Sequence, residues 1–244
     1  MHLLDIVLGF IIIVIAVVSF FSNLLVLLCF IYSVEIRGQV PGIFILNLSF
    51  SNIIIAIVNM PATLVGVAKN MKPFGDSFCS TITFMETFLT TNTTLSMAAL
   101  SIDRWIAMVF PLSYSTKMRY KDAVIMVGYA WVHSFAFSMC ALLFSWAGYN
   151  QTYASCTLHL GATENGWAKF TAFSIVFQTT SFLLPFIILC FTYLKVLTVA
   201  RFHCKRIDVI TVQMVLLFVD IHPRYGSVVS SSTFFLLRLN CGIY

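Results

Sequence analysis

Charged residues are scarce in this sequence of 244 residues: Asp, Glu, Lys and Arg together make up 9% of it, whereas hydrophobic residues make up 60%. A soluble domain carries about 25% charged residues to solvate its surface. A disordered chain contains fewer apolar residues than a soluble domain does. The scarcity of charge therefore excludes both classes. It indicates an integral membrane protein whose main partner is the lipid bilayer.

Catalytic and metal-binding motifs are lacking as well. The seven cysteines form no CxxC pair, and Cys29, Cys140 and Cys190 stand inside apolar runs, where we expect them to pack as small hydrophobic side chains. The histidines are scattered, and the sequence contains no HExxH and no GxSxG. We therefore expect no enzyme activity, no metal and no cofactor. The net charge of +5 does not indicate a nucleic-acid partner, because the basic residues lie in short loops and form no basic face.

Five apolar runs are long enough to cross a bilayer, and they cover about residues 6 to 32, 41 to 68, 78 to 109, 123 to 147 and 168 to 200. None has the alternating polarity of a short barrel strand, so each is predicted to be a helix. The expected fold class is thus an all-α membrane protein, a helical transmembrane bundle. The first run is longer than the core of a cleaved signal peptide and is predicted to act as a signal anchor.

The loops between the runs differ in charge. Arg37, Lys117 and Arg201 are among the basic residues that follow the first, third and fifth runs, whereas the opposite loops hold fewer basic residues and more acids. Because positively charged loops stay in the cytoplasm, we expect the amino terminus to be extracellular and the protein to lie in the plasma membrane as a multi-pass chain. The glycosylation triplet Asn150-Gln151-Thr152 falls in an outer loop, where it would be usable.

After the fifth run the sequence contains no further apolar run of membrane-spanning length. The apolar stretch from Val209 to Val219 is too short to span a membrane, so residues 201–222 are predicted to be a cytoplasmic loop that completes a bundle of residues 1–222. Residues 223–244 read as an atypical tail. No sixth or seventh run is found. The expectation is therefore a five-span product, from either an incomplete gene model or a truncated isoform.

Each run carries a short motif or marker residue. In chain order these are Ser22-Asn23-Leu24-Leu25-Val26, then Asn47-Leu48-Ser49-Phe50-Ser51-Asn52, then Cys79 with Asp103-Arg104-Trp105, then Trp131, and finally Pro185 with Tyr193. Their order and spacing resemble the GNxxV, NLxxxD and DRY signatures and the later markers of the rhodopsin-like, or class A, G-protein-coupled receptors. The resemblance covers about residues 6 to 222, and several stretches are similar to an orphan pair within the family. It implies five spans of a seven-helix receptor fold.

The resemblance also implies a function. The chain would transduce the signal of an unknown small-molecule ligand, or ligand-free activity, to a heterotrimeric G protein, of the stimulatory type that raises cyclic AMP. However, the family's CWxP motif of the sixth span and NPxxY motif of the seventh do not occur. One alternative is therefore a signalling-inactive fragment that associates with full-length receptor as a receptor dimer. Another is a small-solute transporter, although no internal repeat is seen.

Asp103 and Arg104 are the expected switch. An arginine at the inner edge of a membrane is costly unless paired, and the adjacent carboxylate is expected to stabilise it. The resemblance implies that this pair holds the resting state and that the freed Arg104 meets the G protein, together with Trp105, which replaces the usual tyrosine, and Tyr193. The alternative is that Arg104 is only a positively charged anchor at a helix end.

Glu86 is the candidate for a ligand pocket. It lies eighteen residues before Arg104, which is five helical turns, so both point to one helix face. A carboxylate at this depth must face the bundle interior or a water-filled cavity. In the resemblance its position matches the aspartate that amine-binding members use to hold the ligand. The alternative is a protonated or locally paired glutamate that orders the bundle.

Asn23, Asn52 and Thr93 are expected to meet as a polar core in the middle of the membrane. In the family this cluster holds a sodium ion that favours the resting state, but Asn52 is neutral where most members have aspartate. The resemblance therefore implies weak or absent sodium sensitivity and a tendency to ligand-free activity. Cys79 and Cys156 both fall on the outer, oxidising side and are expected to form a disulfide.

Overall fold

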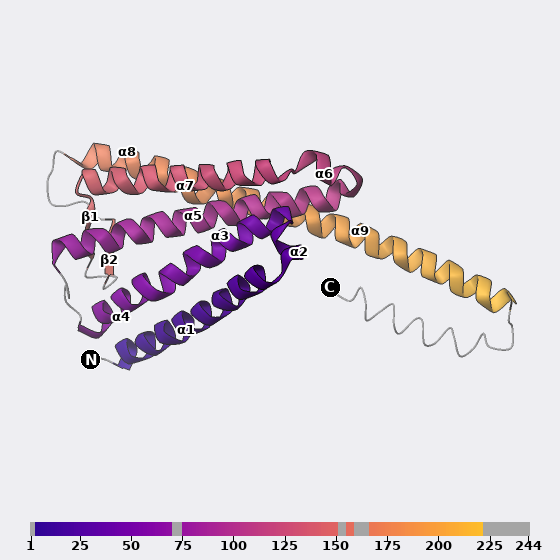
Figure 1. Cartoon of the computed structure of the whole chain (residues 1–244), viewed down its shortest axis with the longest axis horizontal. Coiled ribbons are helices and arrows are strands. Elements are labelled where there is room, and N and C mark those ends of the chain that lie inside the picture. The colour runs from indigo at the N-terminus through magenta and orange to yellow at the C-terminus, as the bar shows by residue number, and fades with distance from the viewer. Residues whose placement is uncertain (1–2, 70–74, 151–154, 159–165, 222–244) are drawn as a thin grey trace.

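The computed structural model describes residues 3–69, 75–150, 155–158 and 166–221 (Figure 1). In chain order the elements are α1 (Leu3–Tyr32), α2 (Val34–Arg37), α3 (Val40–Ile54), the π-helical turn η1 (Ile55–Asn59), α4 (Met60–Lys69), α5 (Asp76–Val109), the 3-10 turn η2 (Pro111–Ser113), α6 (Tyr114–Lys117), α7 (Tyr120–Leu143), β1 (Ala147–Asn150), β2 (Ser155–Leu158), α8 (Trp167–Gln178), the π-helical turn η4 (Thr179–Leu183) and α9 (Leu184–Ile221). The predicted tail 223–244 and the triplet's Gln151 and Thr152 lie outside the described residues.

Long helices laid side by side form the molecule, which confirms the expected all-α membrane bundle (Figure 1). Within the described residues four stretches are long and apolar enough to cross a membrane: Asp5–Tyr32, Val40–Ala68, Tyr120–Leu143 and Trp167–Phe202. A fifth arises when α5 is counted together with the segment Pro111–Lys117 that follows it. The surface agrees with this placement, because large apolar side chains such as Phe10 and Leu25 are exposed while Asn92 and Ser96 are buried.

Two of the spans contain a π-helical turn directly before a proline. The turn η1 ends two residues before Pro61, and η4 ends two residues before Pro185. Proline lacks the N–H that a helix needs and its ring clashes with the carbonyl of the preceding turn. One extra residue in that turn relieves the clash, so each helix continues through its proline instead of ending there.

The third span turns sharply at its carboxyl-terminal end, which we name the inner end after the orientation that the loop charges predict. Pro111 follows α5, and the segment Pro111–Lys117 is bent by 113° from the axis of Asp76–Val109. A residue before proline avoids the helical conformation, and Phe110 has φ −127° and ψ 58° accordingly. The chain then enters α7, where the Arg119 N–H donates to the Asp122 carboxylate at 3.0 Å. The bend therefore folds α6 back against the bundle.

The last helix is longer than the sequence predicted. Residues 201–222 were expected to form a loop, but α9 continues from Leu184 to Ile221 and projects well beyond the other helices (Figure 1). No glycine or proline occurs between Phe186 and Ile221, so nothing in this stretch interrupts the helix. The bundle thus carries a helical extension at its inner end, where a cytoplasmic loop was expected.

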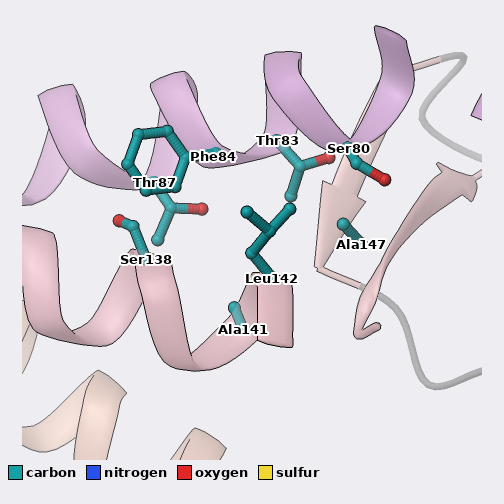
Figure 2. Close-up of a pocket in the computed structure, with 8 residues that line it drawn as sticks. All are labelled: Ser80, Thr83, Phe84, Thr87, Ser138, Ala141, Leu142 and Ala147. Carbon is teal, nitrogen blue, oxygen red and sulfur yellow. The ribbon is translucent and has the colours of Figure 1, made fainter. Parts of the chain in front are cut away.

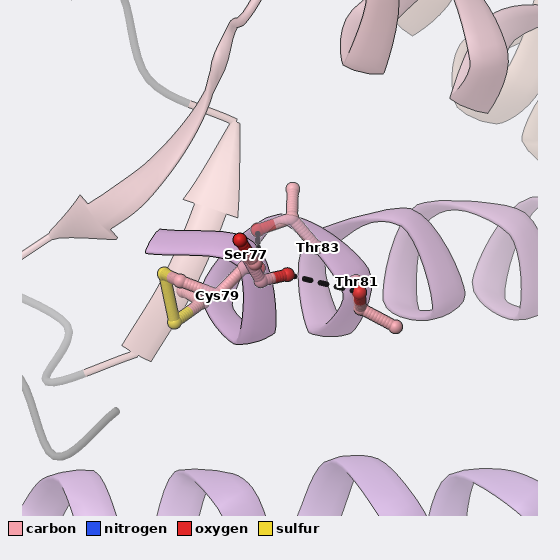
Figure 3. Close-up of a disulfide and its surroundings, with 5 residues drawn as sticks. Ser77, Cys79, Thr81 and Thr83 are labelled. Atoms are coloured by element: carbon pink, nitrogen blue, oxygen red, sulfur yellow. Dashed lines mark hydrogen bonds between the residues drawn. A yellow bond between two sulfur atoms is a disulfide. The ribbon is translucent and has the colours of Figure 1, made fainter. Parts of the chain in front are cut away.

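A hairpin and a disulfide close the opposite end, which we name the outer end on the same expectation. β1 pairs with β2 in antiparallel register, with Tyr149 opposite Cys156, and the hairpin lies beside the start of α5 (Figure 1). Cys156 is bonded to Cys79 with a Cα–Cα distance of 5.3 Å, which confirms the expected disulfide (Figure 3). Both cysteines are buried with Ile82. The bridge therefore ties the outer loop to the third span.

Candidate functional site

A buried carboxylate marks the inner end of the third span. Asp103 is completely buried, and its Oδ1 accepts a hydrogen bond of 2.6 Å from the hydroxyl of Tyr114 on α6. Its Oδ2 is also buried and has no hydrogen-bond partner among the described residues. Burial, together with the hydrogen bond and the negative charge of Asp103, raises the pKa of Tyr114 to about 12, although the positive charge of Arg104 opposes this shift. The bend after Phe110 creates this contact.

Arg104 lies apart from the carboxylate that was expected to hold it. The Arg104 side chain is exposed, whereas Asp103 is buried against α6. Among the described residues, the ion pair at this end of the bundle is between Arg119 and Asp122, with 3.4 Å between Nε and Oδ2. The reason is geometric, because adjacent residues of a helix point about 100° apart and do not face each other. The expected pairing of Asp103 with Arg104 is thus replaced by a pairing of Asp103 with Tyr114.

Arg104 borders a groove at the inner end of the bundle. The groove has a volume of about 530 Å³ and lies between the start of α3, the end of α5 and the segment from α6 to α7. Its lining includes Pro41, Ala107 and Met118 as apolar residues and Arg104 and Arg119 as cations. The groove can therefore take a partner that combines an apolar face with hydrogen-bond acceptors or negative charge.

Trp105 and Tyr193 face other surroundings. The Trp105 ring contacts the rings of Phe110 and Phe191 edge to face, each with centroids 6.3 Å apart. Tyr193 on α9 is 69% exposed, and the structure describes no hydrogen bond for its hydroxyl. Trp105 therefore joins α5 to α9, while Tyr193 points away from the bundle in this conformation, and its role in the switch stays a prediction.

A second polar cluster links the second, third and fourth spans, and sequence reasoning missed it as a unit. Asn47 donates to Ser96 at 2.7 Å and accepts from the Trp131 indole at 2.8 Å. Asn92 donates to Ser51 at 3.0 Å. Asn47 and Ser51 on α3, like Asn92 and Ser96 on α5, are four residues apart. That spacing was the available signal, because it puts each pair on one helix face.

The predicted polar core is assembled only in part. Asn52 donates to the side-chain oxygen of Asn23 at 3.3 Å, so α3 and α1 meet there as expected. Asn23 also donates to the Ser19 carbonyl at 2.7 Å. Thr93 is buried, but its hydroxyl donates to the Thr90 carbonyl of its own helix at 2.8 Å. The two asparagines therefore join the first and second spans. The hydrogen bond described for the Thr93 hydroxyl stays within its own helix, so Thr93 is not part of this contact.

Glu86 is half-buried on the outer half of α5. The nearby pocket between α5, α7 and the start of β1 does not include it; that pocket is lined by Ser80, Thr83, Phe84, Thr87, Ser138, Ala141, Leu142 and Ala147 (Figure 2). The space between these side chains amounts to about 160 Å³, and none of it accommodates a water-sized sphere. The face of α5 that carries Glu86 is thus distinct from the face packed on α7.

The family comparison bears directly on these motifs. The family described as 7 transmembrane receptor (rhodopsin family) matches residues 22–218, which is most of the chain. The chain belongs to this receptor family. It is 56% identical to G-protein coupled receptor 26 of Mus musculus and 54% identical to that of Homo sapiens, each over 206 residues, or 84% of this chain and 61% of the relative. It is 42% identical to G-protein coupled receptor 78 of Homo sapiens over 215 residues, or 88% of this chain and 59% of the relative.

This receptor is therefore a multi-pass membrane protein from a family of receptors and not of enzymes, and it is similar to the orphan pair that its motifs suggested. The transporter alternative is set aside. The chain spans about 60% of the length of the curated relatives it matches. The matched part contains the Asp103–Tyr114 contact, the exposed Arg104 and the groove beside it.

Proposed function

We propose that this receptor passes a signal to a heterotrimeric G protein, of the stimulatory type that raises cyclic AMP, through the groove at its inner end. The observation that carries the proposal is that Asp103 is buried against Tyr114 while the neighbouring Arg104 is exposed at the edge of the groove. An arginine in this position presents several N–H donors to the backbone carbonyls or carboxylates of a docked helix.

The surface beside the groove supports the same proposal. Leu112, in the turn η2, is 99% exposed. At the inner boundary of a membrane protein such a side chain is in contact with water, so a partner that covers it stabilises the complex. The basic residues Arg37, Lys117 and Arg201 support a cytoplasmic inner end, and we propose accordingly that the amino terminus lies outside the cell.

The ligand side of the proposal rests on Glu86. A half-buried carboxylate within a membrane span is retained at a cost, and a ligand ammonium group would offset that cost through a charge-assisted hydrogen bond. We propose an amine as the class of ligand, with Glu86 as its counter-ion. Substitution Glu86→Gln should then abolish any response to an amine agonist and leave ligand-free activity in place.

The experiment uses cells that express the chain joined to the part of human G-protein coupled receptor 26 that lies beyond the aligned region. We expect cyclic AMP to rise above the level of untransfected cells and to return to that level with Arg104→Ala. Lys121→Ala is the matched control, because Lys121 is an exposed cation of the same end that does not line the groove. A chimera that signals equally well with Arg104→Ala contradicts the proposal.

A second candidate concerns the chain expressed by itself. Within the described bundle the apolar window of the first span, Asp5–Tyr32, has no buried residue, so its face is open to lipid or to another helix. We propose that the five-span chain can associate with full-length receptor without signalling. Surface labelling of full-length human G-protein coupled receptor 26, with and without this chain, tests it. An unchanged surface level argues against the association.

A further inference from the structure

Three aromatic rings form a row between the carboxyl-terminal end of α5 and the first part of α9. Trp105 stands in the middle, with Phe110 on one side and Phe191 on the other, and both centroid distances are 6.3 Å. Phe110 and Phe191 are 38% and 52% exposed. The two helices are also joined nearby by the hydrogen bond of 3.1 Å from Thr192 to Ser101. The row is therefore held between the two helices, and the rings of Phe110 and Phe191 remain exposed at the surface of the bundle.

A lysine lies over each end of this row. The Nζ of Lys117 is 3.6 Å from the centroid of the Phe110 ring, and the Nζ of Lys195 is 5.5 Å from the centroid of the Phe191 ring. Both lysines are exposed, and within the described part of the chain neither is in an ion pair. Each ammonium group is therefore held by the electron-rich face of a ring, an attraction that leaves its positive charge uncompensated.

The two lysines and the aromatic row lie where the membrane headgroups can contact them. Lys195 belongs to the apolar stretch Trp167–Phe202, so its ammonium group must reach from the end of a span to the lipid headgroups. Tryptophan, here Trp105, favours the same boundary, because its ring is largely apolar and its N–H can reach water or a headgroup. Zwitterionic phospholipids balance their phosphate charge with an ammonium group of their own, so only anionic phospholipids bring net negative charge to the headgroup layer.

We propose that Lys117 and Lys195, with the row Phe110–Trp105–Phe191 as its floor, form a binding site for anionic phospholipid headgroups of the inner leaflet. The lysines contact the phosphate oxygens, and the acyl chains lie along the exposed apolar face of α9 next to Phe191. None of its five residues lines the groove of Arg104. The inference rests on the membrane placement of the bundle and not on G-protein coupling.

The test measures lipid contact at Trp105. The chain is reconstituted in phosphatidylcholine vesicles that contain a minor fraction of either brominated phosphatidylserine or brominated phosphatidylcholine. The chain has four tryptophans, so the signal of Trp105 is taken as the difference between the chain and its Trp105→Phe variant. Each lysine should favour the anionic lipid about fivefold, so we expect clearly stronger quenching of Trp105 by brominated phosphatidylserine.

The double variant Lys117→Gln with Lys195→Gln should make quenching by the two brominated lipids equal. The control Lys121→Gln with Arg201→Gln removes the same charge from the same end at exposed positions outside the site and should keep the preference. Equal quenching in the unchanged chain overturns the site, and so does an equal loss in both double variants, which indicates diffuse attraction. If the lysines instead bind the G protein, their substitution weakens G-protein binding in pure phosphatidylcholine and no lipid preference is found.

Discussion

Tyr114 holds the carboxylate of Asp103 across the bend that separates α5 from α6, with 2.6 Å between the phenolic oxygen and Oδ1. The contact fixes the orientation of α6 relative to the third span. It also gives the buried carboxylate the one hydrogen-bond donor that the described residues provide for it. The geometry of the inner end therefore depends on a neutral tyrosine and a charged aspartate eleven residues apart.

Substitution Tyr114→Phe should destabilise the bundle. It removes the donor and leaves both carboxylate oxygens of a completely buried Asp103 without a partner. A hydrogen bond to a charged group contributes about 1.5–3 kcal/mol, so we expect a loss of about 2 kcal/mol in the free energy of unfolding, measured by denaturation in detergent micelles. Tyr120→Phe is the control, because Tyr120 is 54% exposed and has no described hydrogen bond. Equal effects of the two changes would argue against the contact.

The same contact predicts a high titration point. The pKa of Tyr114 is raised from 10.0 to about 12, by burial first and then by Asp103. Because the folded pKa exceeds the unfolded one, the fold favours the protonated phenol; this stabilisation is complete below pH 10 and is lost between pH 10 and 12. Phenolate absorbance should therefore include a group near pH 12 that is absent from the Tyr114→Phe variant. A difference spectrum that titrates near pH 10 contradicts the prediction.

Two asparagines of one helix should differ in importance. Asn47 has hydrogen bonds to Ser96 and from Trp131, whereas Asn52 has one described contact, to Asn23. Hydrogen bonds between membrane helices contribute about 0.6 kcal/mol on average, and a buried donor left unpaired costs more. We expect Asn47→Ala to lower the free energy of unfolding by about 2 kcal/mol and Asn52→Ala by about 0.6 kcal/mol. The same denaturation assay ranks the two, and the reverse order would refute the network.

Sodium should not stabilise the unchanged receptor, because its polar core contains Asn52 in place of a carboxylate. The melting temperature should be the same in sodium chloride and in choline chloride. Asn52→Asp supplies the countercharge and should introduce a sodium-dependent rise in melting temperature. In the chimera that tests coupling, the same substitution should lower ligand-free cyclic AMP. Unchanged ligand-free cyclic AMP in the Asn52→Asp chimera counts against the proposed role of this position.

Glycosylation can report which end of the bundle faces outward. Asn150 ends β1 at the hairpin end, whereas the triplets that begin at Asn47 and Asn92 are buried within spans. Only an outward-facing hairpin meets the glycosylation machinery. We expect a mobility shift on treatment with peptide N-glycosidase and none for Asn150→Gln. Absence of a shift in the unchanged chain would argue that the hairpin end lies in the cytoplasm.

The spans and the disulfide could be predicted from the sequence because single physical rules decide them. A run of about 25 apolar residues has few alternatives to a membrane helix, and two cysteines on the oxidising side of adjacent segments readily pair. A proline within such a run can end, kink or bulge its helix, so the sequence alone did not predict that a π-helical turn would precede both Pro61 and Pro185.

The contacts of the inner end could not be predicted, because they depend on the path of the chain. The partner of Asp103 follows from the 113° bend after α5, and sequence adjacency pointed to Arg104 instead. The helix through residues 201–221 was missed for a related reason. A loop was assumed where the apolar span ends, yet an uninterrupted stretch of helix-compatible residues needs no membrane to stay helical.

The length of α9 makes it a lever. Its 38 residues measure about 57 Å, and they form one helix that starts directly after the π-helical turn η4. A tilt of about 5° at that turn displaces the far end by about 5 Å, given the rise of 1.5 Å per residue. A rearrangement too small to alter the packing beside η4 therefore becomes a movement as large as a side chain at Ile221. A protein bound to the projecting part of α9 is therefore displaced by several ångströms when the fifth span tilts slightly at η4.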